Sequence, residues 1–246
     1  MSEGVGPSWA GPLLVPMYFI AGPGVPWGTD DATNDTILEP PPAMTPRAPD
    51  LDPDRWKKAS SLEGWIATTE KNHDLWTGLH GRVSLPEWAE TAAATVEGPV
   101  RLLALTEDWC GDAVNSLPWV DHLARSAPGL EFRVLERDSH EDLMDAHLTG
   151  GTSRSIPVVI AYDEAFREMG WWGPRPSALQ TWVTGPGREL EVEERYREVR
   201  KWYARDRGHE ILREVLEMVG ARGLPESSDT PLPVVSGAGD PDRARR

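Results

Sequence analysis

The chain has one cysteine, Cys110, among its 246 residues. A single cysteine cannot form a disulfide within the chain, so the fold does not depend on oxidation. We therefore expect a reducing, cytoplasmic setting. The sequence does not exclude a disulfide between Cys110 and another molecule.

The sequence also lacks an excess of basic residues. It has 25 Lys and Arg against 40 Asp and Glu, which gives a formal net charge of −15 at pH 7. Nucleic acids and anionic membrane surfaces are bound through basic patches. We therefore expect neither of them as a partner.

No apolar run reaches the roughly 20 residues that a membrane-spanning helix needs. Gly and Pro interrupt the apolar start of the chain, and no positively charged segment precedes it, which argues against a signal peptide. Hydrophobic residues nevertheless make up 39% of the sequence and include 12 Trp. This supply is enough for a core, so we expect a globular protein without a membrane segment.

Pro and Gly are concentrated at the two ends of the chain. Residues 1–49 and 223–246 are rich in both, so we predict that these segments are disordered. Met44, just before the compact part, is a second candidate translation start. Between the ends we predict a helical leader at 50–97, a core at 98–185 and a closing helical segment at 186–222.

Apolar residues recur every three or four positions in the leader and in the closing segment, as on one face of a helix. In the leader, this pattern predicts a helix over 54–79 and a second over 84–96. Ser84 and Glu87 have the spacing of a capping box for the second helix. In the closing segment, the pattern predicts one long charged helix over 189–219.

The core alternates short apolar runs with helical patterns. A strand-helix-strand unit is followed by a helix, a hairpin and a further helix. This order predicts an α/β fold with a four-stranded mixed sheet and helices on both faces. The predicted elements are a strand at 100–105, a helix at 110–126, a strand at 130–136, a helix at 139–148, hairpin strands at 156–162 and 166–172, and a helix at 176–183.

The sequence WCGDA, residues 109–113, places the cysteine at a predicted helix start. Free backbone N–H groups and the positive end of a helix stabilise a thiolate and lower the pKa of a cysteine. Three nearby acidic residues, Glu107, Asp108 and Asp112, raise the pKa by like-charge repulsion. Because the two effects are similar in size, we expect a moderately acidic thiol.

Two segments resemble the thioredoxin superfamily. TEDWCGDAVNSLP is similar to the Trp-Cys-Gly-Pro-Cys active-site segment, with Pro118 at the position of that family's helix-kinking proline. SRSIPVVIAY is similar to the family's Ile-Pro segment, whose proline is cis and packs beside the reactive thiol. Together with GGTSRSIPVV and WWGPRP, they resemble a bacterial thioredoxin-like subgroup with a helical leader and a Trp-Cys-Gly-Asp site. The resemblance covers residues 54–220.

The resemblance implies a thioredoxin-like fold. It implies that Pro157 is cis and that the backbone of Ser155 and Ile156 pairs with an extended peptide beside the thiol. It also implies that the nucleophile and its loop are Cys110 with Trp109, Gly111, Asp112 and Ala113.

The chain departs from the thioredoxin pattern at three positions. Ala113 stands where the family has its second, resolving cysteine, so the dithiol cycle cannot occur. Ala104 stands where thioredoxins bury an Asp that accepts the proton of that second thiol. Asp112 replaces the proline between the two cysteines and adds a negative charge.

Monothiol thiol-disulfide exchange is the function that these residues favour. Cys110 would attack a disulfide of a protein or of a low-molecular-weight thiol such as glutathione, and an external thiol would resolve the product. Arg175 either contacts a carboxylate of a small thiol or belongs to a structural salt bridge. Two alternatives stay open: a non-catalytic thioredoxin-fold binding or scaffold module with a vestigial cysteine, and a sensor whose thiol is oxidised to sulfenic acid.

We predict no metal site and no cofactor. The chain has no phosphate-binding loop and no nucleophile elbow of a hydrolase. The oligomeric state stays open. The six histidines lack the spacing of a metal site; they are His73, His80, His122, His140, His147 and His209.

Overall fold

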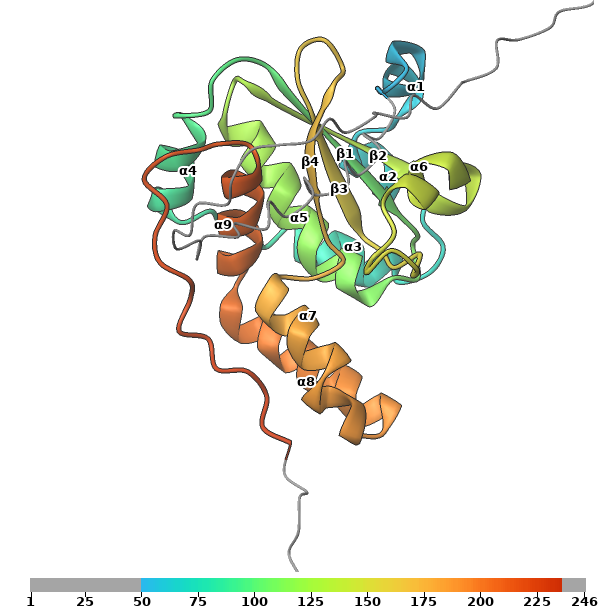
Figure 1. Cartoon of the computed structure of the whole chain (residues 1–246), viewed down its shortest axis with the longest axis vertical. Coiled ribbons are helices and arrows are strands. Elements are labelled where there is room, and N and C mark those ends of the chain that lie inside the picture. Colours follow the sequence, from blue (N-terminus) through green and yellow to red (C-terminus); the bar gives the residue numbers. More distant parts are fainter. Residues whose placement is uncertain (1–49, 236–246) are drawn as a thin grey trace, which may run out of the picture. The chain divides into compact units, whose positions relative to one another are not determined.

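The computed structural model describes residues 50–235 (Figure 1). A four-stranded sheet with the order β2-β1-β3-β4 forms its centre. β1 and β2 are parallel, whereas β3 is antiparallel to both of its neighbours. This is the predicted α/β fold with a mixed sheet, and β3 and β4 form the predicted hairpin. The strands are β1 Val100–Thr106, β2 Leu130–Glu136, β3 Val158–Tyr162 and β4 Glu168–Trp172.

Strands β1 and β3 lie in the middle of the sheet and are buried on both sides. All five residues of β3 are buried, and in β1 only Arg101 is partly exposed. Strands of this kind need cover on both faces of the sheet. The helix α5 (Gly111–Ser126) packs on β2, α9 (His209–Met218) packs on β4, and the two helices pack on each other. They therefore cover the same face.

The leader consists of short helices, so the prediction of one helix over 54–79 is wrong. Ser60 leaves the helical conformation and pairs with Val134 of β2 through both its N–H and its carbonyl group. The hydroxyl of Ser61 then accepts the N–H of Gly64 at 3.1 Å and caps a new helix. Sheet pairing has therefore replaced helix propagation. The helices of this part are α1 Pro53–Lys58, α2 Leu62–Ile66, α3 His73–His80 and α4 Glu87–Ala93.

Two predicted helices begin later than expected, and the predicted cap Ser84 is not used. α4 begins after Pro86 without a side-chain cap, so Ser84 lies outside it. The 3-10 helix η1 (Arg137–Ser139) contains Ser139, and α6 (Glu141–Ala146) begins only after His140. An N-cap side chain must reach the second or third helical N–H, and both serines lie too far ahead to do so.

The predicted helix over 189–219 is two helices, α8 (Val192–Asp206) and α9. Arg207 and Gly208 separate them, and both have left-handed φ angles, of 51° and 76°. At Gly208 an added Cβ would lie 2.2 Å from a ring carbon of Trp119 on α5. The helix is therefore interrupted where the backbone of Gly208 packs against Trp119. The spacing of apolar residues in the sequence does not reveal this contact. The helix α7 (Ser177–Thr184) and the 3-10 helix η2 (Pro186–Glu189) precede α8 and pack against it.

Residues 223–235 form no helix or strand, but they contact the junction of α8 and α9. The hydroxyl of Ser228 donates to Asp206 at 2.9 Å, and its N–H donates to Glu210. Both acidic residues are buried. This part of the predicted disordered tail is therefore held against the fold. The predicted disordered segment 1–49, with Met44, and residues 236–246 lie outside the described residues.

The longest helices of the described part are α5, with 16 residues, and α8, with 15. Among residues 50–235, no helix combines the length and the apolar character that crossing a lipid bilayer requires.

Candidate active site around Cys110

Cys110 follows β1 and is the N-cap residue of α5, at the helix start where the sequence places it. The N–H of Ala113 donates to its Sγ at 3.5 Å, and the thiol donates to the carbonyl oxygen of Ile156 at 3.3 Å. The residue is 5% exposed. The sulfur is thus held between the first turn of α5 and the segment that precedes β3.

Burial raises the pKa of the Cys110 thiol to about 11. Loss of water around the thiolate is the largest cause, and the negative charge of Asp112 adds to it. The N–H groups at the start of α5 and the charge of Arg175 lower the pKa but do not outweigh burial. The expectation of a moderately acidic thiol is therefore wrong, because tertiary packing sets the degree of burial.

Among the three acidic residues that flank Cys110 in the sequence, Asp112 is the one whose charge acts on the thiol. The carboxylate of Asp108 accepts two backbone N–H groups of the turn that precedes α3, at 3.1 and 2.8 Å. The carboxylate of Glu107 accepts a backbone N–H of η1 at 2.9 Å. Glu107 and Asp108 therefore hold neighbouring loops in place.

Asp112 and Arg175 form an ion pair in the wall of the site. Arg175 Nε and Nη2 contact the two carboxylate oxygens at 2.9 and 2.5 Å, and its Nη1 donates to Gln180 at 2.8 Å. The hydroxyl of Tyr203 on α8 also donates to Asp112, at 3.1 Å. Of the two alternatives for Arg175, the structure shows the structural salt bridge. All three guanidinium nitrogens already have partners within the protein.

The segment before β3 lies against the thiol. The Ile156–Pro157 peptide bond is cis, as the resemblance implies. Ile156 is buried, and Ser155 lines the same pocket as Cys110, with its hydroxyl 2.8 Å from that of Ser153. Pairing of this backbone with a bound peptide stays a prediction.

Trp109 and Gly111 border the approach to the thiol. Trp109 is 46% exposed, and the guanidinium of Arg137 lies 5.3 Å from its ring centroid, a cation–π contact. Gly111 is the first residue of α5, and an added Cβ there would meet nothing within 4 Å. The first turn of α5 is therefore uncovered at Gly111.

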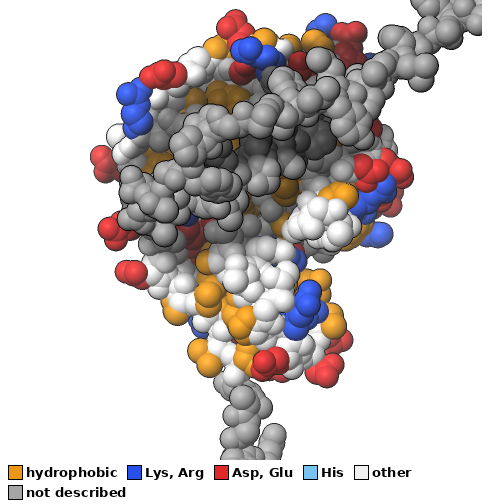
Figure 2. Space-filling model, viewed as in Figure 1, with side chains coloured by type: hydrophobic (Ala, Val, Ile, Leu, Met, Phe, Trp, Pro, Cys, Tyr) orange, Lys and Arg blue, Asp and Glu red, His pale blue; other side chains and the backbone are white. Residues whose placement is uncertain are grey.

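Seven of the nine candidate site residues line one pocket of about 510 Å³, a volume in the range of small-molecule sites, whereas Ala113 and Pro157 do not line it. One face of α8 completes its wall, and three exposed apolar side chains, Leu75, Trp109 and Tyr196, lie along it. Figure 2 shows that hydrophobic side chains also reach the surface over α7 and α8. Sequence reasoning missed Leu75 and the contribution of α8, since the apolar spacing identifies Tyr196 and Tyr203 only as one face of a helix.

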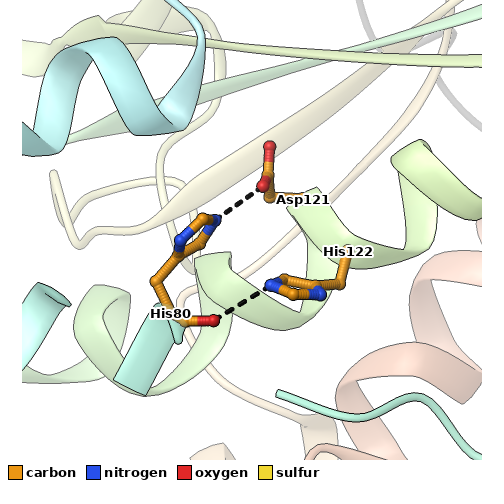
Figure 3. A group of neighbouring side chains, drawn as sticks. All are labelled: His80, Asp121 and His122. Atoms are coloured by element: carbon orange, nitrogen blue, oxygen red, sulfur yellow. Dashed lines mark hydrogen bonds and ion pairs between the residues drawn. The ribbon is translucent and has the colours of Figure 1, made fainter. Parts of the chain in front are cut away.

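A separate cluster joins His80 of α3 to Asp121 and His122 of α5 (Figure 3). His80 Nε2 lies 2.8 Å from a carboxylate oxygen of Asp121, and His122 Nε2 lies 3.0 Å from the carbonyl oxygen of His80. Arg125 Nε contacts the same carboxylate oxygen of Asp121 at 2.8 Å. The ligand atoms of His80 and Asp121 are thus engaged with each other, that of His122 is engaged with a backbone carbonyl oxygen, and Arg125 already supplies a positive charge to Asp121. The cluster ties α3 to α5.

Comparison with known proteins defines the class of this protein. Residues 60–191, more than half of the chain, match the family described as Thioredoxin, so the chain belongs to the thioredoxin family. A 1.5 Å crystal structure of a protein of unknown function from Pseudomonas aeruginosa is similar, with 20% identity, a TM-score of 0.54 and coverage of 66% of this chain and 93% of that chain. An HIV epitope-scaffold has 19% identity, a TM-score of 0.53 and coverage of 68% and 95%. These two likenesses concern the fold alone. No curated protein matches the chain.

Proposed function

We propose that this protein carries out monothiol thiol-disulfide exchange with Cys110 as the nucleophile. One observation carries the proposal: the thiol lies at the start of α5 in the wall of a pocket of about 510 Å³, in contact with the residue that precedes the cis proline. The single cysteine of the chain excludes an internal second thiol.

The reaction has two steps. Cys110 loses its proton and attacks one sulfur of a disulfide, so that the substrate S–S bond breaks and a mixed disulfide with Cys110 forms. The leaving sulfur departs as a thiolate and takes up a proton. An external low-molecular-weight thiol then attacks the mixed disulfide, which releases the Cys110 thiol and forms a new disulfide between the substrate and that external thiol.

The raised pKa slows this exchange at neutral pH without abolishing it. With a pKa of about 11, about one Cys110 in ten thousand is a thiolate at pH 7. A thiolate of higher pKa is the stronger nucleophile, with a Brønsted coefficient of about 0.4–0.5. The smaller thiolate fraction outweighs the gain in nucleophilicity, so Cys110 reacts more slowly at pH 7 than a cysteine of ordinary pKa.

The burial of Cys110 favours a second candidate, a non-catalytic thioredoxin-fold module that binds a partner through the same pocket. In this alternative the neutral thiol is a packing group, and its hydrogen bond to Ile156 is structural. The module would bind equally well with serine at position 110.

Mass spectrometry with oxidised glutathione separates the two candidates. The folded protein is incubated at pH 7, 8 and 9, beside a sample in denaturant that reports full modification. Exchange predicts one glutathione per folded chain and a rate that rises about tenfold per pH unit, because the thiolate fraction rises by that factor below the pKa. A folded protein that stays unmodified at pH 9, beside full modification in denaturant, would contradict exchange and support the module.

Three finer statements belong to the same proposal. The partner is a protein disulfide or a low-molecular-weight thiol such as glutathione. The Trp-Cys-Gly-Asp sequence supports placement in the bacterial thioredoxin-like subgroup with a helical leader. The single cysteine supports a cytoplasmic setting, since reducing compartments keep such a thiol free.

A further inference from the structure

The pocket at Cys110 has one wall that lies outside the thioredoxin family match. The match ends at residue 191, and α8 begins at Val192. α8 nevertheless lines the pocket with residues three or four positions apart, which places them on one face of the helix. These residues are Tyr196, Val199, Arg200 and Tyr203.

Arginine is the prevailing charged residue of the pocket wall. Three of the four arginines have a carboxylate partner: Arg175 pairs with Asp112, Arg137 with Asp138, and Arg154 with Asp145. The fourth, Arg200, is exposed and has no hydrogen bond or ion pair within residues 50–235. Its charge is therefore available to a ligand.

The acidic residue of the pocket wall is Asp112, and Arg175 already neutralises it. The pocket thus presents an uncompensated positive charge in a chain whose formal net charge is −15. A guanidinium pairs with a carboxylate through two parallel hydrogen bonds. The exposed side chains of Leu75, Trp109 and Tyr196 offer apolar contact area for the rest of a small molecule.

We propose that Arg200 forms a carboxylate-binding subsite, so that the substrate of Cys110 is a small disulfide or thiol that carries carboxylates. The statement that this molecule reacts with Cys110 rests on the proposed exchange function, whereas the binding subsite itself does not. The pocket volume of about 510 Å³ fits a single small molecule of this kind. The subsite selects the substrate by charge, and the family match does not include it.

The first test compares two disulfides: oxidised glutathione, which carries carboxylates, and bis(2-hydroxyethyl) disulfide, which is neutral. Arg200→Glu should slow modification by oxidised glutathione about fivefold relative to the neutral disulfide, the upper range for an exposed ion pair. Arg200→Lys should restore most of this preference. Arg205→Glu is the matched control, because Arg205 is exposed on the same helix but does not line the pocket. It should leave the ratio unchanged.

The second test needs no reaction at Cys110. S-methylglutathione keeps the carboxylates but cannot form a disulfide, and its binding is measured by titration calorimetry. Wild type and Arg205→Glu should bind it with equal affinity, and Arg200→Glu about fivefold more weakly. If neither disulfide modifies the protein, the exchange function fails while this titration still decides the subsite. Absence of binding to wild type, or equal binding to Arg200→Glu, would overturn the subsite.

Discussion

The carboxylate of Asp112 and the guanidinium of Arg175 form a two-pronged ion pair, with contacts of 2.9 and 2.5 Å, two residues from the only cysteine. Both side chains are largely buried, at 9% and 12% exposure. Burial raises the pKa of Asp112, and Arg175 counteracts it. This pair holds a charge of each sign near the thiol, and the negative one raises the pKa of Cys110.

Asp112→Asn should lower the pKa of Cys110. The substitution removes the carboxylate charge that adds to the effect of burial on the thiol. The rate of alkylation by the neutral reagent iodoacetamide, measured against pH on the folded protein, reports this pKa. A profile that coincides with wild type would show that burial alone sets the acidity of Cys110.

Asp108→Asn is the control for that experiment. Asp108 is equally close to Cys110 in the sequence, but its carboxylate accepts backbone N–H groups before α3, and an amide oxygen can do the same. Its alkylation profile should match wild type. Asp112→Asn should also destabilise the fold by about 3 kcal/mol, because it leaves a buried guanidinium without its ion. The alkylation must therefore be measured well below the denaturation midpoint.

The core of the fold could be predicted because its signals are local. The central strands β1 and β3 are short, mostly apolar runs, and β2 alternates apolar and charged residues. The helix after Cys110 follows directly from the spacing of its apolar residues. The position of Cys110 at a helix start follows in the same way. These elements are the ones in which local preference and the final packing agree.

The remaining features depend on contacts between distant segments. Ser60 leaves a helical pattern because it pairs with β2, and Gly208 breaks another because Trp119 lies against it. The pKa of Cys110 depends on burial, which no local pattern encodes. The sequence pattern predicts that Arg200 is one of several charged residues on a solvent-exposed helix face. Its position beside the pocket follows only from the packing of α8.

Cys110 should destabilise the folded protein at alkaline pH. Its pKa is raised from 9.0 to about 11, so between these values the folded chain keeps a proton that the unfolded chain loses. Stability is therefore fully present below pH 9 and falls as the pH rises toward 11, by about 2 kcal/mol for this group. Urea denaturation of wild type and Cys110→Ser, compared at pH 8 and 11, measures the effect.

The comparison isolates the cysteine because both proteins keep every other titrating group. Burial also raises the pKa of Tyr162 and of Tyr203, so the stability of both proteins changes at high pH. Only the difference between them reports Cys110. A constant difference from pH 8 to 11 would show that the thiol is no more buried in the folded chain than in the unfolded chain.

Gly208→Ala should be among the most destabilising single substitutions in the C-terminal helices. The residue needs a φ of 76°, and its added Cβ would collide with the ring of Trp119. We expect a loss of about 3 kcal/mol, from backbone strain and overpacking together. Gly220→Ala is the matched control: its φ is 77°, but nothing lies within 4 Å of the added Cβ. It should cost about 1 kcal/mol. Equal losses in urea denaturation would remove Trp119 as the cause of the break between α8 and α9.

Ala113→Cys should convert the single-thiol site into one that releases its own adduct. Position 113 lies three residues after Cys110 on the first turn of α5, and the N–H of Ala113 already contacts the Cys110 sulfur at 3.5 Å. Residues at this spacing are close enough for a disulfide. The introduced thiol attacks the Cys110 sulfur of a glutathione adduct, so the glutathione departs as a thiolate and an internal disulfide forms.

In wild type nothing in the chain can perform that second attack, since Cys110 is the only cysteine. The wild-type adduct should therefore persist after excess reagent is removed, and it should decay only when an external thiol is added. Intact-mass spectrometry over time distinguishes the two: the variant should lose the glutathione mass without added thiol. Ala113→Ser controls for the added side-chain volume in this buried position and should behave as wild type. Wild type or Ala113→Ser could instead lose glutathione spontaneously at the rate of Ala113→Cys. Release would then not need a second thiol, and the lack of a resolving cysteine would not explain a persistent adduct.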